Sequence, residues 1–255
     1  MRLRFLGTGT STGVPCIGCR CEVCTSTDVH DKRLRASAIV TTDEGKNLLI
    51  DCGPDFREQI IAAGAPDLEA CLITHSHYDH VGGVDDLRPY CSAKRHFPLY
   101  CQQNVSDDLR ARVPYCFKEH PYPGVPVFDI NIIKEYVPFM IGGTEILPLS
   151  VAHYKLDILG FRIGRLGYIT DAKFVPDATI DALKGVDTLV INALRHEEHI
   201  SHMTLEQSIA VVEQIKPRKI YFTHMADKIG LHSVVDASLP KDMHLAYDNL
   251  IIDIS

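Results

Sequence analysis

The sequence predicts a layered α/β protein with mixed β-sheets. Short β-type runs recur along all 255 residues, and helical patterns alternate with them irregularly. The expected strands outnumber the helices, which disfavours a strictly alternating doubly wound sheet. The expected strands span residues 2–6, 37–41, 48–51, 70–74, 127–137, 145–151, 160–163, 167–170, 188–191, 219–223 and 250–254. Because no charged or Ser-rich linker divides the chain, residues 1–255 are expected to form a single domain.

Four helices are expected between these strands. Each has apolar residues at helical spacing and is followed by Gly or Pro. They span residues 54–63, 105–113, 176–184 and 204–216. The last pattern is the clearest, because Thr204 and Gln207 have the spacing of a capping box and Pro217 follows the segment.

Composition excludes several classes of protein. Apolar residues make up 45% of the chain, but no apolar run approaches the roughly 18 to 20 residues that a membrane helix needs. The first residues lack the pattern of a secretory signal, so a cytoplasmic location and no membrane partner are expected. The formal net charge of −7 disfavours a generally basic face that binds nucleic acid through its phosphates, although a local basic patch stays open.

Residues 72–83, Leu-Ile-Thr-His-Ser-His-Tyr-Asp-His-Val-Gly-Gly, place four ionisable side chains at the end of an expected strand. In extended backbone, His75 and His77 project to the same side and can bind one metal ion together. Asp79 and His80 follow the turn and can bind a second ion nearby. A polar loop with ordinary histidines is the alternative, but the density of ligands directly after an apolar strand favours a metal site.

This His-x-His-x-Asp-His motif resembles the signature of the metallo-β-lactamase superfamily. His153, Asp171 and His224 each end an expected strand, in the order of the family's later ligands. The resemblance implies an αββα sandwich with two mixed β-sheets and two divalent metal ions, Zn or Mn, in the active site. It assigns one ion to His75, His77 and His153 and the second to Asp79, His80 and His224, with Asp171 bridging both.

His202, in the segment Ile-Ser-His-Met-Thr at 200–204, resembles a residue of the phosphodiesterase branch, which includes ribonuclease Z and the PhnP-type phosphodiesterases. It precedes the expected capped helix, whose N-terminus favours negative charge such as a phosphate oxygen. The resemblance implies that Asp79 and His202 are catalytic, and His202 can protonate the leaving oxygen or donate a hydrogen bond to a phosphoryl oxygen. The alternative is a surface histidine beside His196 and His199.

Four of the nine cysteines lie within nine residues, at Cys16, Cys19, Cys21 and Cys24. Such density without a secretory signal is typical of metal binding. The glycine-rich opening at 5–15 followed by these cysteines resembles the PhnP type, whose Cys-x-Cys-x-x-Cys insertion binds a structural zinc. The resemblance implies a zinc-binding loop at 16–24. Where the PhnP pattern has a fourth ligand His, this chain has Asp227; Asp227 is preferred as the fourth ligand, and Cys16 is the alternative.

The resemblance therefore implies a metal-dependent phosphoric diester hydrolase. The expected substrate is a small anionic phosphodiester, cyclic or aryl, attacked by a metal-bound hydroxide. A transfer-RNA 3′-processing endonuclease is one rival, although the basic surface and docking arm that it needs are not evident. A carboxylic ester or thioester hydrolase and a binding module that retains only the fold are further rivals. A homodimer stays open.

Overall fold

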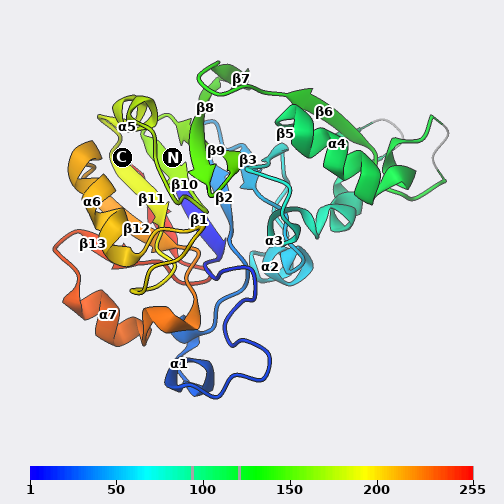
Figure 1. The fold of residues 1–255 in the computed structure, drawn as a ribbon. Helices are drawn as coiled ribbons and strands as arrows, with labels where there is room; N and C mark the ends of the chain where they lie inside the picture. The colour runs from blue at the N-terminus through cyan, green and yellow to red at the C-terminus, as the bar shows by residue number, and fades with distance from the viewer. Residues whose placement is uncertain (93–94, 120–121, 255) are drawn as a thin grey trace.

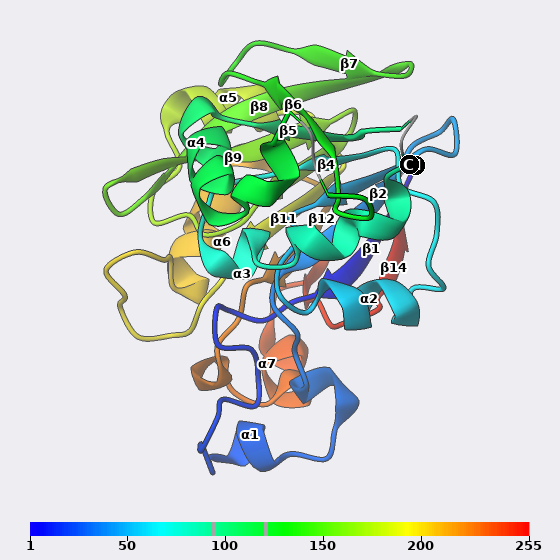
Figure 2. The same ribbon diagram turned by 90° about the vertical axis from the view of Figure 1, so that its right-hand side faces the viewer.

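The strands form two sheets that pack face to face, with helices on both outer faces (Figures 1 and 2). The computed structural model describes residues 1–92, 95–119 and 122–254. Each sheet has seven strands and is mixed, with one parallel and one antiparallel part. The expected αββα sandwich is therefore confirmed.

The first sheet is antiparallel at the edge that holds the N-terminal strand and parallel at the other edge. In spatial order its strands are β14 (Ile251–Asp253), β1 (Arg2–Gly7), β2 (Ser37–Thr41), β3 (Asn47–Ile50), β4 (Ala70–Leu72), β5 (Phe97–Cys101) and β6 (Phe128–Ile132). The parallel part begins with the β3–β4 pair. The loops that follow β3 and β4 therefore leave the same edge of the sheet.

The second sheet has a parallel part at the C-terminal side and an antiparallel part built from hairpins. In spatial order its strands are β13 (Met243–Leu245), β12 (Lys219–Thr223), β11 (Thr188–Asn192), β10 (Leu166–Ile169), β9 (Leu156–Ile163), β8 (Thr144–His153) and β7 (Phe139–Ile141). The carboxyl ends of β10, β11 and β12 lie at one edge, where ligands commonly bind in open α/β sheets.

The helices form the two outer layers. On the first sheet lie α2 (Phe56–Ala62), α3 (Tyr78–Val81) and α4 (Gln103–Arg112), and on the second lie α5 (Asp177–Leu183), α6 (Leu205–Ile215) and α7 (His232–Ser238). A further short helix, α1 (Glu22–Thr25), lies in the cysteine-rich loop, and 3₁₀ turns span Val29–Asp31, Val84–Tyr90, Pro114–Phe117 and Asp227–Ile229. Among the described residues, no helix has both the length and the apolar character to cross a membrane.

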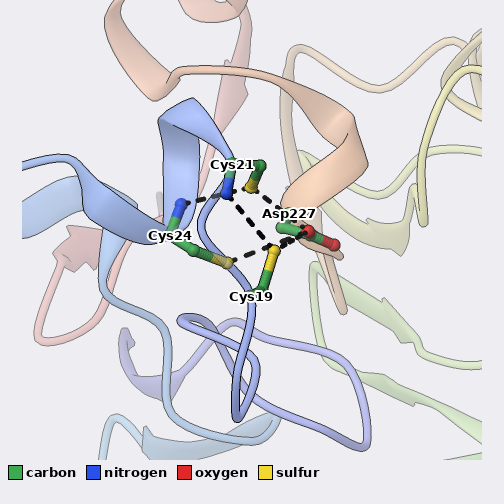
Figure 3. Close-up of side chains that lie close together, drawn as sticks. All are labelled: Cys19, Cys21, Cys24 and Asp227. Carbon is green, nitrogen blue, oxygen red and sulfur yellow. Dashed lines mark hydrogen bonds between the residues drawn. The ribbon is translucent and has the colours of Figure 1, made fainter.

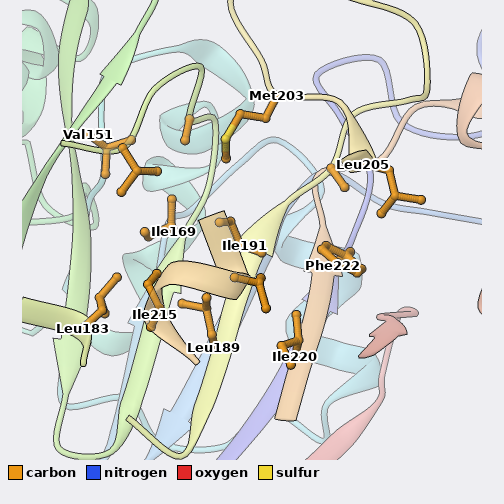
Figure 4. Close-up of a cluster of buried hydrophobic side chains, with 14 of the residues drawn as sticks. Val151, Ile169, Leu183, Leu189, Ile191, Met203, Leu205, Ile215, Ile220 and Phe222 are labelled. Carbon is orange, nitrogen blue, oxygen red and sulfur yellow. The ribbon is translucent and has the colours of Figure 1, made fainter. Parts of the chain in front are cut away.

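Three apolar layers hold this arrangement together. Phe5 of the first sheet and Phe161 of the second are fully buried between the sheets. Phe56 of α2 is buried against the outer face of the first sheet. Leu183 of α5 and Ile215 of α6 pack on the outer face of the second sheet (Figure 4). Each layer removes apolar surface from water, at about 25 cal/mol per Å².

The four expected helices correspond to α2, α4, α5 and α6, and their ends agree to within two residues or so. The capping box of α6 is present: the Thr204 hydroxyl accepts from the Gln207 N–H and the Gln207 side chain accepts from the Thr204 N–H. The short helices α1 and α3 were not expected, because four residues are too few to show a repeating apolar face. Helix α7 was not expected because its large apolar residues, Val234 and Val235, are adjacent and not at helical spacing.

One expected strand is wrong in extent. Residues 127–137 form β6 only as far as Ile132, and β7 begins at Phe139 in the other sheet. Between them Tyr136 has a φ of 60°, and the chain crosses from one sheet to the other. Strand β5 was not expected, because Pro98 interrupts its pattern. Strand β13 was not expected either, because its three residues are too few to show a pattern.

Candidate metal centre

Three histidines from both sheets form the first group of candidate ligands. His75 and His77 follow β4, and His153 ends β8; their ligand nitrogens all lie within 4.8 Å of one another. His75 Nε2 lies 3.0 Å from His77 Nδ1. His153 donates from Nδ1 to the Ser201 carbonyl over 2.8 Å, which leaves its Nε2 available for a metal. The structure thus brings together the three residues that the resemblance assigns to one ion.

Asp79, His80, Asp171 and His224 form a second group, and all four are buried. His80 Nε2 lies 3.2 Å from an oxygen of Asp79 and 3.2 Å from an oxygen of Asp171. His224 Nε2 lies 3.1 Å from the other oxygen of Asp171. Asp171 also lies close to His153 and His202, so it stands between the two groups as expected of a bridging ligand.

The charges of the site fit divalent cations. Burial lowers the pKa of His80, but the carboxylates of Asp171, Asp51 and Asp79 outweigh it and raise that pKa well above its ordinary value. Three buried carboxylates therefore demand positive charge at this point. The Nε2 atom of His80 is buried without a hydrogen-bond partner while its Nδ1 donates to Asp51, which is the state of an imidazole whose second nitrogen serves a metal. Both ring nitrogens of His224 are buried without a hydrogen-bond partner, so either can serve a metal. The residues present fit a pair of divalent ions.

Asp51 is a site residue that the sequence did not reveal. Its carboxylate accepts hydrogen bonds from the Thr74 N–H and hydroxyl, both over 2.8 Å, and from His80 Nδ1 over 2.7 Å. The Thr74 hydroxyl, which donates to Asp51, lies 3.0 Å from His75 Nδ1 and can accept from it. One carboxylate thereby orients a candidate ligand of each group: His80 directly, and His75 through the Thr74 hydroxyl. Its only signal in the sequence is an acidic residue at the end of an expected strand.

Three residues of the site have left-handed backbone conformations. Asp51, Asp171 and His224 have φ values of 60°, 59° and 55°, and each directly follows or lies close to the end of a strand. Such conformations cost of order 1 kcal/mol or more for residues with a side chain, and they cluster at functional sites. Here they occur where the chain leaves β3, β10 and β12, at residues whose side chains meet in the site.

His202 lies beside both ligand groups at the start of α6. Its ring centroid is 4.7 Å from that of His153 and 4.9 Å from that of His224, and its Nδ1 lies 3.8 Å from Asp171 Oδ1. Nδ1 is buried and has no hydrogen-bond partner. Burial and the adjacent His224 lower the pKa of His202 to about 3, so the imidazole is neutral at neutral pH. The surface alternative is wrong, because only 9% of His202 is exposed.

A separate cluster joins the cysteine-rich loop to the 3₁₀ turn at 227–229 (Figure 3). An oxygen of Asp227 lies 3.5 Å from the sulfur of Cys19, 3.4 Å from that of Cys21 and 3.8 Å from that of Cys24. The Cys16 sulfur instead contacts the Gly13 carbonyl at 3.4 Å, and only its backbone N–H reaches the cluster, at the Cys24 sulfur. The geometry favours Asp227 over Cys16 as the fourth ligand of a tetrahedral zinc site.

Comparison with known proteins places this geometry in a family. The model of the beta-lactamase superfamily domain matches residues 46–225. An octanoyltransferase of Porphyromonas gingivalis is 45% identical over 256 residues, which cover 99% of this chain and 52% of that protein. This chain thus spans about half the length of that relative.

Solved structures agree with this assignment. The crystal structure of a diphosphatase from the PhnP family superimposes with a TM-score of 0.92 at 36% identity and covers 100% of this chain and 98% of that one. The short form of human tRNase Z superimposes with a TM-score of 0.74 and full coverage of both chains, but at 16% identity it shows the fold alone. Because the family model matches most of this chain, the chain belongs to the beta-lactamase superfamily, and it resembles the PhnP family within it.

Proposed function

We propose that this chain is a dinuclear metal-dependent phosphodiesterase that hydrolyses small anionic phosphodiesters. The observation that carries the proposal is the position of His202: its buried Nδ1 has no hydrogen-bond partner, and its ring lies between the two ligand groups. A polar atom buried without a partner costs free energy, and a bound substrate oxygen offers the missing partner.

The proposed roles follow from the contacts. Divalent ions held by the two ligand groups would activate the nucleophile and stabilise charge on the phosphoryl oxygens. Asp171 and Asp79 hold the positive charge in place, and Asp51 fixes the orientation of His75 and His80. Neutral His202 supplies an N–H donor for a phosphoryl oxygen. Two divalent ions bring four charges against three carboxylates, an excess of one positive charge that favours an anionic substrate.

A diphosphate linkage is a second form of the same substrate class. It is supported by the diphosphatase of the PhnP family, which shares 36% identity over the whole chain. A diphosphate flanked by two organic groups carries one phosphodiester-like charge on each phosphorus, so the same ligand and donor set suits it.

A different candidate is hydrolysis of an acyl ester or thioester. The observation that favours it is the octanoyltransferase relative, which is 45% identical to this chain. That activity belongs to a protein about twice as long. The site favours an anionic reacting group, whereas the reacting group of an ester or thioester is neutral, so this candidate needs its own assay.

A substrate panel tests these alternatives. Purified protein is assayed with Mn²⁺ and with Zn²⁺ against bis(nitrophenyl) phosphate, a 2′,3′-cyclic nucleotide, a ribose cyclic phosphate, a dinucleoside diphosphate and octanoyl-coenzyme A. We expect turnover of at least one phosphodiester or diphosphate and none of the thioester. Elemental analysis is expected to find close to three metal ions per chain. Thioester turnover alone, or one ion or fewer, would contradict the proposal.

A further inference from the structure

An exposed tyrosine occupies a strained turn directly beside a metal ligand. Strands β8 and β9 are joined by Tyr154 and Lys155, a two-residue turn that follows His153. Tyr154 has a φ of 57°, whereas Lys155 is not among the residues with positive φ. This pattern is that of hairpin turns whose first position normally holds glycine. A bulky side chain at such a position is strained, whereas a glycine would form the same turn without that strain.

Within the described part of the chain, the ring contact recorded for this tyrosine is with Lys155 of the same turn. The Tyr154 side chain is 53% exposed, and its hydroxyl makes no hydrogen bond with any residue that the structure describes. Tyr136 is a useful contrast, because it also has a positive φ, but its hydroxyl is hydrogen-bonded to Thr179 Oγ1 over 2.8 Å. The Lys155 ammonium lies 5.3 Å from the centroid of the Tyr154 ring and covers one of its faces.

A second exposed aromatic residue lies on the segment that pairs with the strand leading into this turn. Phe174, three residues after Asp171, is 61% exposed. Its backbone pairs with Ala152, with N–H to carbonyl distances of 3.0 and 3.1 Å in the two directions. Ala152 lies two residues before Tyr154, so the two rings belong to neighbouring backbone segments. Both segments also carry candidate ligands, His153 and Asp171.

We propose that Tyr154 and Phe174 bind a planar aromatic group of the substrate, such as a nucleobase, while its phosphoryl group lies at the metal centre. This inference rests on the proposed function for the location of the phosphoryl group. Aromatic side chains stack on bases with little regard to base identity. The stacking gives a role to a tyrosine at a position where the turn favours glycine, and it makes nucleoside-bearing phosphodiesters the preferred substrate class.

The first test separates a binding role from a structural one. In Tyr154→Gly, the turn receives the residue that its backbone favours, so the melting temperature is expected to be unchanged or higher. Tyr136→Gly, which removes a hydrogen-bonded tyrosine from a comparable backbone position, is expected to lower it. A clear fall in the melting temperature of Tyr154→Gly would show that the tyrosine serves the fold and would overturn the proposal.

The second test measures binding of matched probes that need not be hydrolysed. Isothermal titration calorimetry with the Mn²⁺-loaded protein compares adenosine monophosphate with ribose 5-phosphate, which lacks the base. Wild type is expected to bind the nucleotide about tenfold or more tightly. Tyr154→Gly and Tyr154→Leu are expected to lose most of this preference, and Tyr154→Phe to keep it. Equal affinities in wild type, or an undiminished preference in Tyr154→Leu, would overturn the inference.

Hydrolysis then distinguishes this inference from the proposed function. For a 2′,3′-cyclic nucleotide against a ribose cyclic phosphate, the inference expects a higher kcat/KM for the nucleotide that Tyr154→Gly reduces through KM. Turnover of both at equal kcat/KM would leave the phosphodiesterase standing and refute the aromatic site. A base-dependent preference in calorimetry without turnover of any phosphodiester would support the aromatic site and refute the phosphodiesterase.

Discussion

Asp51 shows how one buried carboxylate can set the geometry of two ligand groups. It accepts directly from His80 and, through the Thr74 hydroxyl, is linked to His75. Both histidines then keep Nε2 free for a metal. A ligand held this way gains basicity and loses rotational freedom, and outer partners of this kind typically affect metal affinity by about 10- to 100-fold.

Asp51→Asn is therefore expected to weaken metal binding by about 10- to 100-fold. The Thr74 hydroxyl and His80 share one carboxylate oxygen, and the Thr74 N–H donates to the other. An amide replaces one of these oxygens by an NH₂ donor and removes the negative charge, so it cannot accept all three hydrogen bonds. Competition with a chromophoric chelator measures the affinity. Asp253→Asn, an exposed change on β14, is the control. Wild-type metal affinity in Asp51→Asn would contradict this role.

His202 is expected to act as a hydrogen-bond donor and not as a source of protons. With a pKa lowered to about 3 by burial and His224, the imidazole carries no proton that it can release readily at neutral pH. His202→Ala is expected to lower kcat/KM by roughly 10²-fold, the cost of one donor to a developing oxyanion.

The loss should be similar for an activated nitrophenyl diester and for a diester with a poor alkoxide leaving group. Exposed His196→Ala is the matched control. A much larger loss on the poor leaving group would show that His202 delivers a proton after all.

At the scale of elements, patterns within a single helix or loop could be predicted from the sequence, whereas the pairing of strands could not. The capping box and apolar face of α6 are complete within residues 204–216, so the sequence alone defined that helix. The ligand motif at 75–80 is equally local. Asp51 was missed because its role depends on the pairing of β3 with β4, which brings it beside Thr74. The run at 127–137 was assigned to one strand because periodicity does not show where the chain changes sheets.

The cysteine-rich loop is expected to depend on a bound metal for its stability. It contains only the four-residue helix α1 and a small apolar cluster of Val14, Val23 and Cys24. Asp227→Ala is expected to speed zinc release to a colorimetric chelator by at least tenfold and to lower the melting temperature, because binding energy at such sites is folding energy.

Cys16→Ser is the matched control for this element, because its sulfur faces the Gly13 carbonyl and should leave zinc retention unchanged. Retention that depends on Cys16 and not on Asp227 would reverse the assignment of the fourth ligand. Replacing Cys19, Cys21 and Cys24 together by Ser should lower stability yet leave residual turnover, since this cluster is separate from the other ligand groups.

At the scale of the whole molecule, the candidate metal centre takes its ligands from both sheets. Asp79 and His80 follow strands of the first sheet, whereas His153, Asp171 and His224 come from the second. Bound ions should stabilise the folded state by mass action, about 2.7 kcal/mol at a free concentration 100 times the dissociation constant. Removing them with a chelator is expected to lower the melting temperature, and adding Zn²⁺ or Mn²⁺ should restore it. An unchanged melting temperature after verified loss of the ions would contradict this coupling.

The charge of the whole molecule bears on the size of the substrate. Binding of a long polyanion by phosphate contacts releases counterions and falls steeply with salt, which requires a basic surface. With a net charge of −7, this chain is expected to gain little from a large nucleic acid over a small diester. The fold that it shares with human tRNase Z does not decide the matter, because fold alone does not specify substrate. The decisive measurement is kcat/KM for precursor transfer RNA relative to a small phosphodiester at two ionic strengths. We expect this ratio to differ from one by less than orders of magnitude and to depend only weakly on salt. A large preference for the RNA that disappears at high salt would instead assign the site to transfer-RNA processing, even with every metal ligand in place.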